Sequence, residues 1–269
     1  MSFSDYRTAL VTGASSGIGA AVVERLCREN IEVHALARSA EPLRILAEKT
    51  GCIPHAIDVT DRAALAELTA QIEFDILVNN AGVDRPKKFL ESDEGDIDLL
   101  IDVNLRAVLH LCRMVVPGMV ARDNGHVINI SSIAGAYNFG GNSSYHATKA
   151  AVSMLSNQLR LDAFGKRVRV TEICPGRVAT DIFAHVHGDD PSIRERFIDG
   201  FELPEAADIA EAIAFAIAAP IAVNIGHMEI TPTLQVMGGL QTARPATPRA
   251  VPSSKGLSSK ARASKGSKP

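Results

Sequence analysis

Short apolar, β-branched runs alternate with longer helical patterns along most of this chain, from residue 7 to about residue 237. This alternation is typical of βαβ units and of a parallel sheet. Right-handed crossovers place helices on both faces of such a sheet. Several runs, such as Ile76-Leu77-Val78, are apolar throughout, as expected for strands covered on both sides. The sequence therefore predicts an α/β fold with a doubly wound, seven-stranded parallel sheet.

The expected elements follow one another at regular spacing, and no internal repeat is present. Asp61 is expected to cap the third helix, and Pro204-Glu205 to open the last one. The least structured stretch inside the fold is 181–203. The predicted strands are 9–11, 32–37, 53–57, 76–79, 126–130, 168–173 and 228–230, and the predicted helices lie near 17–29, 41–49, 61–72, 96–121, 143–164 and 205–218.

Charge divides the chain into two parts. Residues 1–240 carry 21 basic and 31 acidic residues, whereas 241–269 carry seven basic residues and no acidic one. The second part is rich in Ser, Ala, Pro and Lys, so we expect one domain over 1–240 and a disordered basic tail over 241–269. The tail lacks aromatic side chains and an amphipathic stripe, so neither nucleic acid nor a membrane is an expected partner. With no membrane-length apolar run and no signal pattern, we expect a soluble cytoplasmic protein.

Cysteine and histidine spacing predicts no metal site. The histidines form no HExxH pattern, and the close pair His185 and His187 lacks neighbouring ligands. We expect reduced, buried thiols at the four cysteines, which are far apart and form no CxxC pair: Cys27, Cys52, Cys112 and Cys174.

A glycine-rich turn follows the first expected strand and opens the first helix. Gly13 would allow a tight turn, Gly17 would let the backbone approach a pyrophosphate, and Gly19 would let the helix pack closely. The TGxxxGxG spacing differs from GxGxxG, and a purely structural glycine turn is the alternative. Strand, turn and helix together predict a dinucleotide site in a single-domain Rossmann fold, with cofactor contacts from Gly13, Ser15, Ser16, Gly17, Ile18 and Gly19.

The end of the second strand indicates which dinucleotide binds. A site selective for NAD holds an acidic side chain there, but this chain has Ala37 followed by Arg38. A guanidinium at this point would pair with a 2′-phosphate, so Arg38 favours NADP(H); a surface arginine without a ligand is the alternative.

Tyr145 and Lys149 are the candidate catalytic pair. They are four residues apart on an expected helix and so share one face. A nearby ammonium, together with oxidised nicotinamide, would favour the phenolate and make Tyr145 a general acid or base near neutral pH. Ser132 follows the carboxyl end of a strand, where its hydroxyl would hold the substrate oxygen. Alone, a YxxxK pair also occurs by chance on helix surfaces.

At these residues the chain resembles the short-chain dehydrogenase/reductase family. The resemblance covers about residues 5–235, with the motifs in family order and at family spacing. They are TGASSGIG at 12–19, Asp58-Val59, Asn79-Asn80-Ala81-Gly82, Asn104, Ser132, Tyr145 with Lys149, and Pro175-Gly176-Arg177-Val178-Ala179-Thr180.

The resemblance implies a role for each motif. Asp58 and Val59 would contact adenine, Asn80 and Ala81 would line the adenosine ribose, and Lys149 would hold the nicotinamide ribose. It further implies that Asn104 positions a water, that Val178 and Thr180 contact the carboxamide, and that Gly82, Pro175 and Gly176 belong to the same cofactor site. Ordinary turn and strand-end roles are the alternatives for Asp58, Asn79, Asn80 and the Pro175-Gly176 bend.

The carboxyl-terminal core looks like the branch that oxidises 3-hydroxy acids and β-hydroxy amino acids, such as allo-threonine or serine, with NADP. It departs from that branch where His185 and His187 stand in place of basic residues, so Arg85, Arg177 or Arg194 are the candidate partners of a substrate carboxylate. The alternatives are a reductase of another aldehyde, ketone or 3-oxoacyl thioester, and an NADP-sensing regulatory protein. Family resemblance also implies a homo-oligomer, a tetramer or dimer, in which the helices near 96–121 and 143–164 pair.

Overall fold

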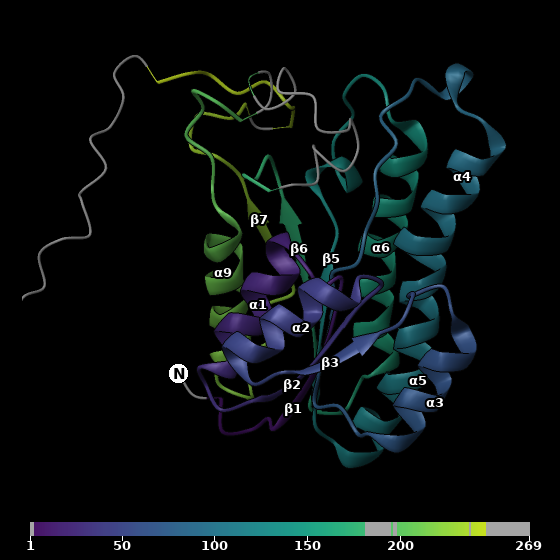
Figure 1. The fold of residues 1–269 in the computed structure, drawn as a ribbon, viewed down its shortest axis with the longest axis vertical. Helices are drawn as coiled ribbons and strands as arrows, with labels where there is room; N and C mark the ends of the chain where they lie inside the picture. Colours follow the sequence, from purple (N-terminus) through teal and green to yellow (C-terminus); the bar gives the residue numbers. More distant parts are fainter. Residues whose placement is uncertain (1–2, 181–194, 196–197, 237, 246–269) are drawn as a thin grey trace, which may run out of the picture.

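The computed structural model describes residues 3–180, 195, 198–236 and 238–245, and it contains one parallel sheet (Figure 1). The strand order is β3-β2-β1-β4-β5-β6-β7, and all neighbours are parallel. This confirms the predicted α/β fold. The order reverses between β1 and β4, where open sheets of this kind bind ligands. The strands are β1 (Thr8–Thr12), β2 (Glu32–Ala37), β3 (Ile53–Ala56), β4 (Ile76–Asn79), β5 (Gly125–Ile130), β6 (Val168–Pro175) and β7 (His227–Ile230).

Helices cover both faces of the sheet (Figure 1). Because side chains alternate along a strand, Ala9 and Val11 of β1 join one hydrophobic core, whereas Leu10 joins the other. The first core lies under α1 (Gly17–Cys27), α2 (Ala40–Thr50) and α9 (Ala206–Ala218), and the second under α3 (Arg62–Gln71), α5 (Ala107–Arg122) and α6 (Ser143–Asp162).

The helix predicted over 96–121 is divided. It consists of α4 (Glu94–Ile101), the π-helical turn η2 (Asp102–Arg106) and then α5. A π-helical turn is rare and often marks a functional site, and this one buries Asn104. Two short 3-10 helices, η1 (Phe89–Glu91) and η3 (Ile133–Gly135), were also not predicted.

Capping is as the sequence predicted. Asp61 Oδ1 accepts the backbone N–H groups of Ala63 at 3.1 Å and Ala64 at 3.0 Å, which opens α3. Glu205 caps α9 in a capping box with Asp208.

Arg169 of β6 ties the amino-terminal segment to the end of α9. Its side chain is buried, and its guanidinium donates to the Tyr6 hydroxyl at 2.8 and 3.0 Å. It also donates to the carbonyl groups of Ala216, Ile217 and Ala219, at 3.2, 2.7 and 3.1 Å. Carbonyls at the end of a helix have no partner within it and attract a cation.

The described residues beyond 240 stay with the fold. Thr242 forms an antiparallel bridge with Gln235, and the Arg244 guanidinium lies 5.1 Å from the centroid of the Phe201 ring. The rest of the predicted tail, residues 246–269, and the pair His185 and His187 lie outside the described residues. No helix within the described ranges has the length and apolar character needed to cross a membrane. The four cysteines are free, as predicted; Cys27 is partly exposed and the other three are buried.

Candidate active site

The glycine-rich turn lies at the carboxyl end of β1. Gly13 has φ +65°, and a Cβ atom there would lie 2.8 Å from the Ala81 Cα atom, so the position requires glycine. A Cβ atom at Gly19 would lie 2.2 Å from the Gly13 carbonyl oxygen, so this glycine lets α1 pack against the turn itself. At Gly17, with φ +53°, an added Cβ would touch only Thr180, at 3.7 Å. Gly17 is therefore the glycine of the turn with open space around it, and the turn is open to a ligand at this residue.

The segment after β4 supports this turn. Asn80 Nδ2 donates to the carbonyl groups of Thr12 at 2.9 Å and Gly13 at 3.2 Å. Thr12 Oγ1 in return accepts the N–H groups of Asn80 and Ala81, both at 3.0 Å. Asn80 therefore satisfies strand-end backbone groups and shapes the glycine turn. Its place beside an adenosine ribose stays a prediction.

The start of α1 is suited to an anion. Ser16 is the N-cap residue, but its side chain makes no capping hydrogen bond, so the first N–H groups of the helix are uncapped by it. Beside them lies a hollow of about 480 Å³ between α1 and α9, lined by Gly17, Thr180 and Glu205 among others. The structure thus brings together residues from the first and last cofactor motifs. Of the turn residues between, Ser15 and Ile18 are partly exposed.

The loop after β6 holds the remaining predicted cofactor residues. Pro175 ends the strand, and the Gly176 N–H donates to the Ile230 carbonyl at 2.8 Å. A Cβ atom at Gly176 would lie 2.7 Å from Gln235 Oε1 and 2.9 Å from Thr231 Cγ2, so a larger residue here would require these side chains to move. Val178 is buried in the core under α1 and α9. The loop therefore has a clear structural role as well as its predicted cofactor contacts.

Arg38 is exposed directly after β2, and no described residue forms a hydrogen bond or ion pair with its side chain. A guanidinium at this point is available to a phosphate. Asp58 is engaged, because its Oδ1 accepts the N–H group of Thr60 at 2.9 Å and the Thr60 hydroxyl at 2.8 Å. Val59 is buried in the core under α3 and α5. The expected adenine contacts of Asp58 and Val59 stay predictions.

Ser132, Tyr145 and Lys149 form one cluster at the carboxyl edge of the sheet. Ser132 Oγ accepts the Ala134 N–H group at 3.1 Å and shares a side-chain hydrogen bond with Tyr145. Lys149 Nζ lies 5.6 Å from the centroid of the Tyr145 ring, as expected for residues four apart on a helix. Nζ also donates to the Ile130 carbonyl at 3.0 Å. The arrangement places a phenol, a hydroxyl and an amine around one point.

Burial controls the protonation of this cluster. Loss of solvent lowers the pKa of Lys149 to about 8, while the Asp84 carboxylate acts in the opposite direction. Loss of solvent also raises the pKa of the Tyr145 phenol; Asp84 adds to the rise, and the Ser132 hydrogen bond opposes it. In the protein as described, burial therefore favours the protonated phenol, and the phenolate expected beside bound oxidised nicotinamide stays a prediction. Near neutral pH Tyr145 is a protonated phenol, which is a proton donor.

Asn104 orients the loop that passes beside Lys149. Its Oδ1 accepts the Val83 N–H group and its Nδ2 donates to the Val83 carbonyl, both at 2.8 Å. A Cβ atom at Gly82 would lie 3.4 Å from Asn104 Oδ1 and 3.6 Å from Lys149 Nζ, so Gly82 separates the two side chains. The expected role of Asn104 in holding a water stays a prediction.

Asp84 is a candidate that the sequence reasoning missed. Its Oδ1 accepts a hydrogen bond from Asn142 Nδ2 at 2.5 Å, which links the loop after β4 to the start of α6. Its charge acts on both Tyr145 and Lys149. The available signal was its position two residues after Gly82, in a loop at the carboxyl edge.

The arginines considered for a substrate carboxylate are held by other groups. Arg85 Nε lies 3.4 Å from Asp96 Oδ1. The Arg177 guanidinium lies 5.1 Å from the centroid of the Phe201 ring and donates to the Leu240 carbonyl at 3.1 Å. Arg194 lies outside the described residues.

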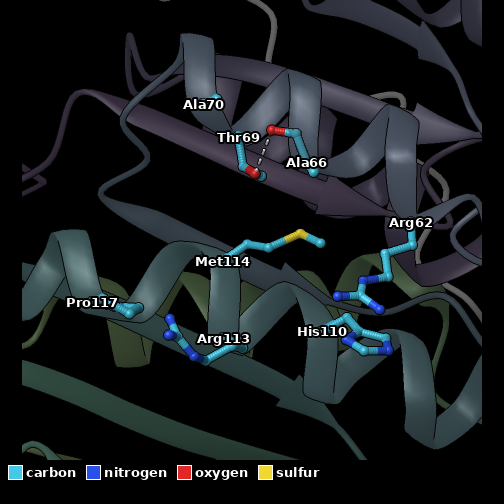
Figure 2. A pocket seen from close by; sticks show the side chains of 8 residues that line it. All are labelled: Arg62, Ala66, Thr69, Ala70, His110, Arg113, Met114 and Pro117. Carbon is cyan, nitrogen blue, oxygen red and sulfur yellow. Dashed lines mark hydrogen bonds between the residues drawn. The ribbon is translucent and has the colours of Figure 1, made fainter.

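A second hollow, of about 330 Å³, lies between α3 and α5 (Figure 2). It contains none of the predicted site residues, so it is not part of the candidate active site. Its lining is Arg62, Ala66, Thr69, Ala70, His110, Arg113, Met114 and Pro117.

Comparison with known sequences supports the family resemblance. A family model described as short chain dehydrogenase matches residues 7–190. The uncharacterized short-chain type dehydrogenase/reductase y4eK of Sinorhizobium fredii is 37% identical over 240 residues, which cover 89% of this chain and 96% of the relative. The NADP-dependent 3-hydroxy acid dehydrogenase YdfG of Escherichia coli is 37% identical over 246 residues, covering 87% and 98%.

Solved structures agree with the sequence relatives. The closed form of serine dehydrogenase complexed with NADP+ aligns with a TM-score of 0.82 and 35% identity, covering 88% of this chain and all of that one. Serine dehydrogenase from Escherichia coli aligns with a TM-score of 0.72 and 33% identity, covering 85% and 99%. Fold, site and relatives together show that this chain belongs to the short-chain dehydrogenase/reductase family of oxidoreductases.

Proposed function

We propose that the protein is an NADP(H)-dependent oxidoreductase that transfers a hydride between nicotinamide and a small hydroxy or carbonyl substrate. The substrate class is a 3-hydroxy acid, a β-hydroxy amino acid or the corresponding semialdehyde. The observation that carries the proposal is the cluster of Tyr145, Ser132 and Lys149, at the sheet edge that also holds the open glycine turn. The relatives named for NADP, 3-hydroxy acids and serine support the cofactor and the substrate class.

The protein supplies the proton and the alignment, while the cofactor supplies the hydride when bound. In the reductive direction, the Tyr145 phenol donates its proton to the substrate oxygen, and the Ser132 hydroxyl donates a hydrogen bond to the same oxygen. Lys149, an ammonium below about pH 8, stabilises the phenolate that is left. In the oxidative direction, that phenolate accepts the proton of the substrate hydroxyl.

Replacing Tyr145 by Phe tests the proposed acid. The change removes only the hydroxyl, so turnover should fall by about 10²–10⁴-fold while the affinity for NADPH stays nearly constant. Turnover is measured as loss of NADPH absorbance with semialdehydes, 3-oxoacyl thioesters and simple ketones, and in reverse with 3-hydroxy acids and β-hydroxy amino acids. A Tyr145→Phe variant with full activity would show that Tyr145 is not the proton donor. A wild type that binds NADPH but oxidises none of it would favour a sensor.

Arg38 tests the choice between the two nicotinamide cofactors. An aspartate here removes the cation that would pair with the 2′-phosphate and adds a repulsive anion. Arg38→Asp should therefore lower the preference for NADPH. We expect the kcat/KM for NADPH divided by that for NADH to fall by at least about tenfold, which corresponds to roughly 1.4 kcal/mol. Arg28→Asp, at an exposed position after α1, is the matched control. Equal selectivity in Arg38→Asp and wild type would refute the assignment.

A further inference from the structure

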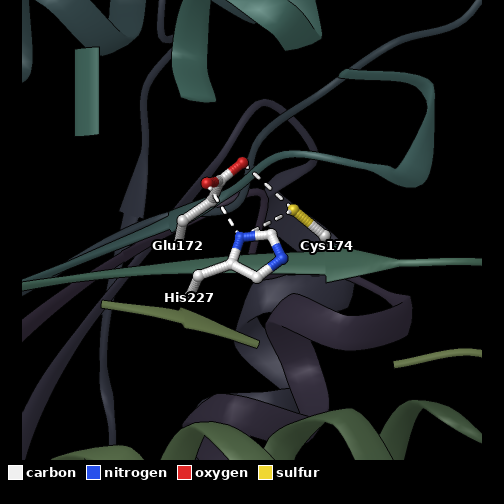
Figure 3. Close-up of side chains that lie close together, drawn as sticks. All are labelled: Glu172, Cys174 and His227. Atoms are coloured by element: carbon white, nitrogen blue, oxygen red, sulfur yellow. Dashed lines mark hydrogen bonds and ion pairs between the residues drawn. The ribbon is translucent and has the colours of Figure 1, made fainter. Parts of the chain in front are cut away.

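We propose that Glu172, Cys174 and His227 form a binding site for a single zinc ion, separate from the hydride-transfer cluster (Figure 3). One potential ligand atom of each residue lies within 4.8 Å of the others. The sequence predicted no metal site because no spacing of cysteines and histidines indicated one. The proposal depends on the arrangement of two neighbouring strands and does not rest on the proposed reaction, although Cys174 lies near enough for its charge to act on Lys149.

The pairing of β6 with β7 brings the three side chains together. Glu172 lies opposite His227 in the parallel register, and Cys174 is two residues further along β6. Residues two apart on a strand project from the same face. Val170, at the same parity on β6, belongs to the core under α5 and α6, so the cluster lies on the α6 side of the sheet. The fold itself therefore determines the cluster.

The distances within the cluster are within a few tenths of an ångström of those in a tetrahedral zinc site. His227 Nδ1 lies 3.7 Å from Cys174 Sγ and 3.1 Å from Glu172 Oε2, whereas the 3.0 Å contact of Cys174 Sγ is with the other carboxylate oxygen, Oε1. Zinc–sulfur bonds of about 2.3 Å and zinc–nitrogen or zinc–oxygen bonds of about 2.0–2.1 Å place tetrahedral ligands about 3.3–3.6 Å apart. Small side-chain movements would bring all three atoms to these separations.

The donor set is the one that zinc prefers. Thiolate, imidazole and carboxylate together favour zinc over the hard cations magnesium and calcium, which take oxygen ligands. Two serine hydroxyls hold the carboxylate in place, because Ser131 Oγ and Ser153 Oγ both donate to Glu172 Oε1. Glu172 Oε2, on the side of His227, is then the oxygen that would bind the ion. Such outer hydrogen bonds commonly orient metal ligands.

Exposure provides an entry path. Glu172 and Cys174 are buried, whereas the side chain of His227 is 49% exposed. The ion would enter past the imidazole, with three ligands from the protein and water in the fourth position. Binding releases the Cys174 thiol proton to solvent, and no electron is transferred. Because zinc and the proton compete for the sulfur, the affinity should rise with pH.

Cobalt(II), added to the full-length, untagged and reduced protein, tests the ligand set by spectroscopy. We expect one equivalent to bind, with a thiolate-to-cobalt charge-transfer band in the near ultraviolet and the strong visible bands of tetrahedral cobalt. One equivalent of zinc should abolish both. Cys174→Ala should remove the charge-transfer band, and His227→Asn should weaken binding at least tenfold. Ser153→Ala removes the hydroxyl that supports Glu172 and that also donates to the Lys149 carbonyl within α6, and it should weaken binding about tenfold.

Two variants serve as matched controls. Cys52→Ala removes another buried thiol, and His110→Asn removes a partly exposed imidazole in the hollow of Figure 2, so both should bind cobalt like the wild type. Zinc should also raise the unfolding temperature of the wild type but not that of His227→Asn, and magnesium should raise neither. The absence of a charge-transfer band in the wild type, or a band that persists in Cys174→Ala, would overturn the proposal.

Discussion

At Tyr145, burial and a neighbouring carboxylate act in the same direction. Both favour the protonated phenol, while Ser132 alone opposes them. At Lys149 the two effects differ in sign, because burial disfavours the ammonium and Asp84 favours it. Asp84 therefore raises the pKa of both groups. In the proposed oxidative reaction Tyr145 must first lose its proton. Because Asp84 raises the pKa of Tyr145, the phenolate forms only at higher pH.

Replacing Asp84 by Asn should lower the pH at which oxidation becomes efficient. The amide keeps an oxygen that can accept the Asn142 hydrogen bond, but the negative charge is lost. The pKa of Tyr145 should then fall, so the rising limb of kcat against pH should move down by about one unit. Asp98→Asn, on the exposed surface of α4, should leave the profile unchanged. Superimposable profiles for Asp84→Asn and wild type would show that the carboxylate does not act on the reacting groups.

How much of the site could be predicted depends on how far apart its residues lie in the sequence. Tyr145 and Lys149 are one helical turn apart, so their common face follows from the sequence alone. Their pKa shifts depend on burial and on Asp84, whose placement requires the packed fold. Likewise, Cys174 and His227 are 53 residues apart and meet only through strand register. No local spacing could indicate that contact.

Among the secondary-structure elements, strands were predicted more closely than the long helix near 96–121. Strands buried on both faces have continuous apolar runs, and β2 and β4 begin and end at the predicted residues. The π-helical turn η2 inserts one extra residue into a helix that is otherwise continuous. No glycine or proline marks the insertion, so the sequence pattern still reads as one helix. The turn nevertheless positions Asn104, whose contacts depend on it.

Alanine substitutions at two glycines should separate backbone strain from crowding in the glycine-rich turn. Gly13 and Gly51 both have positive φ, +65° and +76°, so each alanine should cost about 1 kcal/mol from conformation alone. Nothing lies within 4 Å of an added Cβ at Gly51, whereas one at Gly13 would meet the Ala81 backbone. Crowding should add about 1–3 kcal/mol for Gly13→Ala. Urea unfolding measures both variants, and equal losses of unfolding free energy would contradict the tight packing.

On the surface of the molecule, α6 exposes large apolar side chains. Met154 is 58% and Leu161 is 65% exposed, and their spacing of seven residues places them on one helix face. Leu109 of α5 is also exposed. Apolar side chains gathered on one face often mark an interface. These residues support the proposal of a homo-oligomer, a tetramer or dimer, in which the long helices pair between subunits.

Charged substitutions on α6 should therefore reduce assembly. Met154→Glu combined with Leu161→Glu would place two carboxylates in the proposed subunit contact, where their desolvation is unfavourable. Sedimentation velocity should show an oligomer for the wild type and mainly smaller species for the double variant. Ile45→Glu, at a residue 55% exposed on α2, should sediment like the wild type. A wild type that sediments only as a monomer would contradict the assembly.

The hydrogen bonds of Arg169 should respond to pH differently from the cluster of Ser132, Tyr145 and Lys149. Carboxylate-based links weaken as acid protonates them, but a guanidinium held by peptide oxygens and a phenol depends on no group that titrates in mild acid or mild alkali. Burial raises the pKa of the Tyr6 phenol, which keeps that partner neutral as well. The hydrogen bonds from Arg169 to the amino-terminal segment and to α9 should thus persist while Lys149, with its pKa of about 8, gains or loses its charge. The rate of the reaction can therefore change with pH while these Arg169 contacts stay the same.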